Sequence, residues 1–101
     1  MPQDTEFTEF VALIEMTDSS AQNVQELASV WGDIQAELDQ IDASIQNAYA
    51  VLGEFDFLVT FEGPATETAF EADVILERHG LRVQTLPMID TAAFSRLVDD
   101  L

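Results

Sequence analysis

The chain has 101 residues, of which 48% are hydrophobic and seven are phenylalanine, and it sets 20 acidic side chains against three basic ones for a formal net charge of −17. The length predicts a single domain over residues 1–101, and the apolar content excludes an intrinsically disordered chain, which lacks the residues for a core. The absence of cysteine excludes disulfides and thiolate chemistry, and three arginines without a lysine exclude the basic stripe that nucleic-acid binding requires.

The first third of the chain predicts a strand followed by a helix. Residues 7–16 are apolar and β-prone, and Ser19 with Gln22 fits a capping box that opens a helix. Gly32 inside that helix either permits close packing or marks a bend. The apolar residues of the helix recur at spacings of three and four, which is typical of one buried stripe: Val24, Leu27, Trp31, Ile34, Leu38 and Ile41.

The middle of the chain predicts a hairpin and a second helix. Residues 43–52 and 55–62 have the pattern of two strands joined by a turn at Gly53–Glu54. The second helix is expected to begin at an N-cap, Thr66, and to end before Gly80, which suits the left-handed position after a helix.

The last quarter predicts a fourth strand over residues 81–88, with Pro87 at an edge or an end, and then a C-terminal helix capped by Asp90 or Thr91. The order is β-α-β-β-α-β followed by a helix. It predicts an α+β, ferredoxin-like fold in which two helices cover one face of a four-stranded antiparallel sheet.

The parity of the hairpin turn predicts which of its side chains share a face. With an even turn, small residues oppose large ones on the helix-covered face: Ala48, Ala50 and Leu52 with Phe55, Phe57 and Val59. The other face then receives a half-apolar set: Ile45, Asn47, Tyr49, Val51, Asp56, Leu58, Thr60 and Glu62. Such a face predicts a cover from a second copy, with polar groups lining a chamber between the two sheets. An odd-length loop would exchange the two faces.

The hairpin resembles the signature of the GYD domain family, which is named for a Gly, a Tyr and an Asp at this place. Within Ala48–Phe57, Gly53 and Asp56 match the signature, whereas Phe55 stands where the family has tyrosine. Three further stretches are similar: residues 10–13 leading to Thr17–Asp18, Gly63–Pro64, and residues 82–86. The resemblance extends from about Phe7 to Leu97. It implies a ferredoxin-like fold of the dimeric α/β barrel type and no established activity, and any chemistry of the signature phenol is absent here.

Five polar side chains are the candidates for ligand contacts: Asn47, Tyr49, Asp56, Thr60 and Arg82. Asp56 is either a ligand-binding carboxylate or general base, or a turn residue that bonds nearby backbone or an arginine. Tyr49 and Asn47 fit a mostly apolar pocket, and Tyr49 fits an interface equally well. Arg82 either pairs with Asp56 or Glu62 or binds an anionic ligand.

His79 is the only histidine, so one chain offers no multi-histidine metal site, and neither a metal nor a cofactor is expected. Arg78 and His79 are expected to complement the dipole at the end of the second helix. The leading hypothesis for function is a homo-oligomeric domain that binds a small molecule, or acts as a regulatory module, at the open sheet face. The alternatives are a small dimeric-barrel enzyme and a structural module that docks another protein.

The acidic residues are spread along the chain, which predicts adaptation to high salt. A net charge of −17 opposes a compact state by self-repulsion, and molar salt shortens the Debye length to ~3 Å. A mimic of nucleic acid or a cation buffer would gather its acid on one face. Residues 1–10 lack a signal-peptide pattern and no apolar run reaches membrane-spanning length, so a cytoplasmic protein without a membrane partner is expected.

Overall fold

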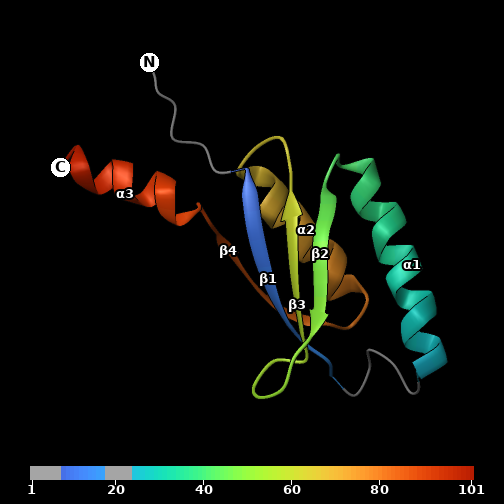
Figure 1. The fold of residues 1–101 in the computed structure, drawn as a ribbon. Coiled ribbons are helices and arrows are strands. Elements are labelled where there is room, and N and C mark those ends of the chain that lie inside the picture. The colour runs from blue at the N-terminus through green and yellow to red at the C-terminus, as the bar shows by residue number, and fades with distance from the viewer. Residues whose placement is uncertain (1–7, 18–23) are drawn as a thin grey trace.

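The computed structural model describes residues 8–17 and 24–101, and its elements follow the predicted order (Figure 1). They are β1 (Glu9–Glu15), α1 (Val24–Gln40), β2 (Ser44–Ala50), β3 (Phe57–Glu62), α2 (Glu67–Arg78), β4 (Arg82–Pro87) and α3 (Thr91–Asp99). The strands form one antiparallel sheet in the order β2-β3-β1-β4. The α+β, ferredoxin-like fold is therefore confirmed. The predicted capping box at Ser19 and Gln22, and the side chains of Val24 and Leu27, lie outside the described residues.

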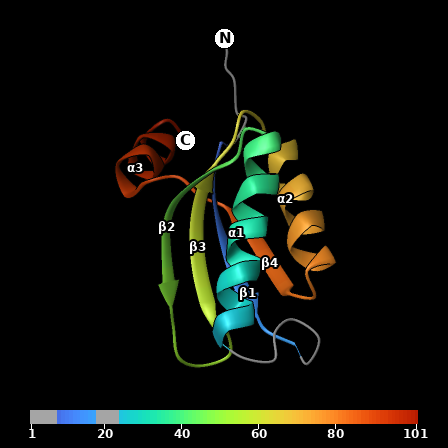
Figure 2. The same cartoon turned by 90° about the vertical axis from the view of Figure 1, so that its right-hand side faces the viewer.

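The core lies between the sheet and the two helices α1 and α2, which cover the same face (Figure 2). Successive residues of a strand point to opposite faces, and β1 alternates between half-buried and buried positions accordingly. Phe10 of β1 packs on Phe61 of β3 with ring centroids 5.2 Å apart, and Trp31 of α1 meets Phe57 edge-on at 5.6 Å. The first contact joins the two central strands to each other, and the second fixes α1 over β3.

The helices α1 and α2 end in the same way. Gly80 has a φ of 84°, and the N–H of Leu81 bonds the carbonyl of Leu76, as the predicted role of Gly80 requires. At the end of α1 the left-handed position is held by Asp42, with a φ of 59°. Thr66 occupies the N-cap position of α2 as predicted, but without a side-chain capping hydrogen bond.

The hairpin keeps the predicted parity, since Ala48 pairs with Val59 and Ala50 with Phe57. Two details of the predicted faces are wrong. Leu52 does not face the helices but is fully exposed, because β2 ends at Ala50. A register shift between Ile45 and Asn47 turns Ile45 from the open face toward the core, where it packs opposite Phe61.

The C-terminal helix α3 begins at the predicted cap, where the side chain of Asp90 accepts a hydrogen bond of 2.7 Å from the N–H of Ala93. It buries none of its residues and projects beyond the edge strand β4 (Figure 1). Among the residues described, no helix combines the length and apolarity needed to span a membrane.

Candidate functional site

The face of the sheet turned away from α1 and α2 brings side chains from all four strands together. Strand pairing arranges eight of them in two adjacent rows, Asn47–Thr60–Val11–Leu86 and Tyr49–Leu58–Leu13–Gln84. We call these eight residues the neutral strip, because none is charged although charged residues make up 23% of the chain. Charged pairs flank the strip, with Glu9 beside Glu62 at one end and Glu15 beside Arg82 at the other.

Three of the five predicted ligand contacts lie side by side within the neutral strip. The amide of Asn47 on β2 donates a long hydrogen bond of 3.4 Å to the hydroxyl of Thr60 on β3. Tyr49 lies two residues further along β2 on the same face, and it is 54% exposed. Their polar groups stand beside the aliphatic side chains of Val11 and Leu58, which is the composition of a small-molecule site.

Arg82 lies on the same face but at the other edge of the sheet. Two strands separate β4 from β2, which places Arg82 about 14 Å from the strand that carries Tyr49 at ~4.8 Å per strand. Its guanidinium pairs with Glu15 at 3.1 Å, so the predicted pairing with Asp56 or Glu62 is wrong. The cause is the register of β4 on β1, which puts Glu15 directly opposite Arg82.

Asp56 forms hydrogen bonds to the backbone at the end of β1. Its Oδ2 accepts a hydrogen bond of 2.8 Å from the N–H of Met16, and its own N–H donates to the carbonyl of Ile14. The carboxylate therefore fastens the hairpin loop to the end of β1, which agrees with the structural alternative for this residue. A ligand-binding role for Asp56 stays a prediction, with one of its carboxylate oxygens already engaged.

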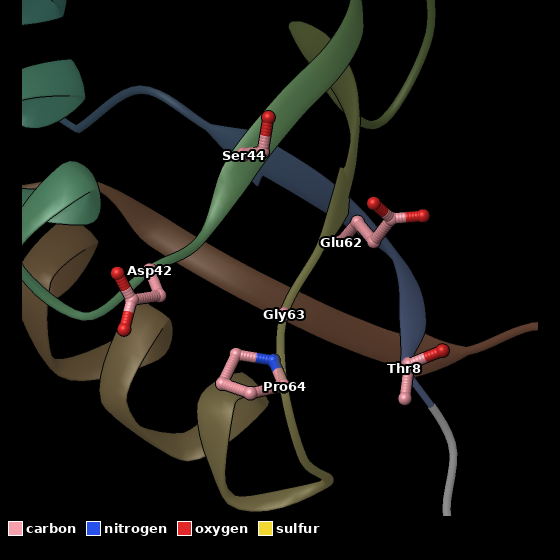
Figure 3. A pocket seen from close by; sticks show the side chains of 6 residues that line it. All are labelled: Thr8, Asp42, Ser44, Glu62, Gly63 and Pro64. Atoms are coloured by element: carbon pink, nitrogen blue, oxygen red, sulfur yellow. The ribbon is translucent and has the colours of Figure 1, made fainter.

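A hollow of about 340 Å³ lies at the end of the sheet where β2 begins and β3 ends (Figure 3). It is lined by Thr8, Asp42, Ser44, Glu62, Gly63 and Pro64. The carboxylates of Asp42 and Glu62 point away from each other, and the described residues contain no group of three or more side chains that could hold a metal ion. Sequence reasoning missed this hollow, because it depends on how the turn after α1 approaches the end of β3.

Other ionisable groups lie away from the neutral strip. Glu37 of α1 meets two side chains at the end of α2, with its Oε2 2.5 Å from Nε2 of His79 and its Oε1 3.4 Å from the guanidinium of Arg78. Burial raises the pKa of Asp73 on α2, whose side chain accepts a hydrogen bond from Thr85 of β4 on the covered side of the sheet. Both arrangements hold helices in place rather than line the open face.

Comparison with known proteins finds a family match and solved structures of similar fold. The model of the GYD domain matches residues 10–98, and no curated protein matches the chain significantly. Among solved structures, SCO4226 from Streptomyces coelicolor A3(2) is similar over 78% of this chain and 94% of that one, with 14% identity and a TM-score of 0.53.

Two regulators from Mycobacterium tuberculosis are also similar. A feast or famine regulatory protein complexed with L-methionine is 19% identical, and a leucine response regulatory protein is 20% identical, each over 82% of this chain with a TM-score of 0.50. This chain spans about half of their length, 50% and 51% respectively. At these identities the likeness concerns the fold alone.

Proposed function

This chain belongs to the GYD domain family, and from that premise we propose that it is a homo-oligomeric regulatory module that binds a small molecule at the open face of its sheet. The observation that carries the proposal is the neutral strip. The exposed sheet face of a chain with 20 acidic residues would be expected to carry charge throughout, yet its charged pairs lie at the two ends and the eight positions between them are uncharged. Depletion of charge is the mark of a surface that becomes desolvated.

A second copy supplies the cover. When two sheets pack face to face, any charge between them loses its hydration at a cost of several kcal/mol, and a neutral strip avoids that cost. The charged pairs at both ends of the strip, such as Glu9 beside Glu62, then stay at the wet rim. Asn47, Thr60 and Tyr49 line the space between the sheets, where they supply polar contacts in a mostly apolar chamber.

This assembly also explains why Arg82 lies so far from the other candidates. A two-fold axis parallel to the strands sets β4 of one copy over β2 of the other. Arg82 of the partner subunit then stands close to Tyr49, and four of the five candidate residues, Asn47, Tyr49, Thr60 and Arg82, meet between copies rather than within one. A guanidinium and a neutral, partly apolar wall suit a small molecule with one anionic group, such as an amino acid.

Amino acids are therefore the first probes, and L-methionine leads because a mycobacterial regulator of similar fold is complexed with it. In calorimetric titrations in molar KCl, L-methionine or L-leucine is expected to bind and to raise the melting temperature by mass action. Tyr49→Ala and Thr60→Val should abolish the signal. Phe70→Ser, a change at an exposed position on the outer side of α2, should leave it intact.

The proposal fails if the chain stays monomeric in molar KCl at every concentration, with the neutral strip in contact with solvent. It also fails if ligands bind the Tyr49→Ala and Thr60→Val variants as tightly as they bind the original chain, because the site then lies elsewhere.

A further inference from the structure

The C-terminal helix carries an apolar stripe that nothing in the described chain covers. Three large hydrophobic residues of α3, together with Leu101 just beyond its end, follow the spacing of one helix face, and their exposed fractions are 58% for Phe94, 56% for Leu97, 49% for Val98 and 102% for Leu101. No residue of α3 is buried. An amphipathic helix of this length gains its stability mainly from packing its apolar face, so α3 requires a partner.

The position of α3 identifies where that partner lies. The N–H of Met88 donates to the carbonyl of Glu9, and beyond this bond the chain leaves the sheet at the β4 edge. Figure 1 shows α3 projecting past β4, and Figure 2 shows it on the side of the sheet opposite α2. That is the side onto which the neutral strip opens. A molecule seated on the strip would therefore meet α3.

The area of the open face points to the same conclusion. Four strands at ~4.8 Å and about seven residues at ~3.3 Å give the face a flat outline of roughly 400 Å², whereas each partner of a standard interface buries about 800 Å² of accessible surface. The outline of the face is small for an interface of that size. The stripe of α3 adjoins the open face and adds apolar surface to it.

We propose that α3 is an arm that packs its apolar stripe against the second copy seated on the open sheet face, at the edge of that copy formed by β2. The inference rests on the face-to-face assembly proposed above and adds the segment that completes it. The two-fold axis that sets β4 over β2 also brings α3 of one copy beside β2 of the other. This strand needs cover, because six of its seven residues are exposed, including Ala48 and Ala50 on the covered face of the sheet. Each arm thereby closes one side of the chamber.

Sedimentation equilibrium in molar KCl tests the arm. The variant Leu97→Ser/Val98→Ser is expected to raise the dimer dissociation constant at least about tenfold, since two aliphatic side chains lose their burial. Circular dichroism should show the domain still folded, because α3 buries nothing within its own chain. The matched control Phe70→Ser removes an exposed apolar side chain from α2 and should change the constant less than threefold.

A second variant tests the face-to-face assembly independently of α3. Tyr49→Asp places a charge in the neutral strip and should dissociate the dimer whatever α3 does. If Tyr49→Asp dissociates the dimer while Leu97→Ser/Val98→Ser leaves it unchanged, the face-to-face assembly stands and the arm is overturned. If the original chain is monomeric throughout, the proposed assembly fails and the arm with it.

Discussion

The carboxylate of Asp73 on α2 accepts a hydrogen bond from the hydroxyl of Thr85 on β4, at the place where the helix packs on the edge of the sheet. Burial raises the pKa of Asp73 above its ordinary value of 3.8, the bond from Thr85 opposes that rise, and the neighbouring charge of Glu77 adds to it. The ionised carboxylate is therefore less favourable in the folded chain than in the unfolded chain. This difference makes the free energy of unfolding depend on pH through the ionisation of Asp73.

Asp73→Asn is expected to raise the free energy of unfolding at pH 7 by up to about 1 kcal/mol, a modest figure because the side chain keeps partial exposure. The folded state holds the Asp73 proton more tightly than the unfolded state, so Asp73 favours folding more as pH falls from the raised pKa toward 3.8. The advantage of Asn over Asp should accordingly shrink over that window and vanish below it. Urea titrations at several pH values measure the difference.

Thr85→Val provides the control for this pair. It removes the hydrogen bond that stabilises the ionised carboxylate, so it should cost about 1 kcal/mol at pH 7 in the original chain and less in the Asp73→Asn background. A difference between Asp73 and Asn that stays constant with pH would show that burial does not shift this carboxyl.

Asp56 should matter for stability through its bond to the N–H of Met16. Asp56→Ala is expected to lower the free energy of unfolding by about 1.5–3 kcal/mol, the range for a hydrogen bond to a charged group, and Asp56→Asn by less because an amide oxygen can still accept. The urea midpoint measures both. Glu54→Ala, an exposed acidic neighbour in the same loop, should stay within about 0.5 kcal/mol of the original chain. Equal midpoints for Asp56→Ala and Glu54→Ala would contradict this role.

Gly63 and Gly32 form a matched pair of glycines with opposite expectations. A Cβ at Gly63 would run into the buried side chain of Thr68, so Gly63→Ala should cost about 1–3 kcal/mol by overpacking. A Cβ at Gly32 would meet nothing within 4 Å, and Gly32→Ala should stabilise α1 by about 1 kcal/mol. Thermal melts of both variants measure the contrast. A stable Gly63→Ala chain would mean that Thr68 moves aside.

The hairpin shows which structural features local sequence can predict. Gly53–Glu54 between two apolar runs predicts the hairpin and its parity, and the observed pairing of Ala50 with Phe57 agrees, although the loop spans residues 51–56 rather than two residues. Those signals lie within ten residues of each other. The bulge that turns Ile45 to the core has no comparable local signal, because it depends on how β2 meets Phe61 and the helix-covered core.

Partners distant in the sequence could not be predicted for the same reason. Arg82 pairs with Glu15 across 67 positions, and that choice follows from the register of β4 on β1. The sequence predicts Asn47, Tyr49 and Thr60 on one open face, since strand alternation decides it locally. It does not predict that α3 leaves its stripe uncovered, because a spacing of three and four indicates an apolar face without indicating which molecule covers it.

Salt should stabilise this chain through screening of its own charge. The Debye length falls from ~10 Å at 0.1 M to ~3 Å at 1 M, so repulsion among the acidic side chains weakens and the free energy of unfolding should rise steadily with KCl. Urea titrations across that range measure the slope. Replacing three exposed acids, Asp33→Asn, Asp39→Asn and Glu71→Gln, lowers the repulsion and should reduce the slope. If that variant kept the full salt slope, salt would be acting on apolar burial rather than on charge, and the adaptation to high salt would need another cause.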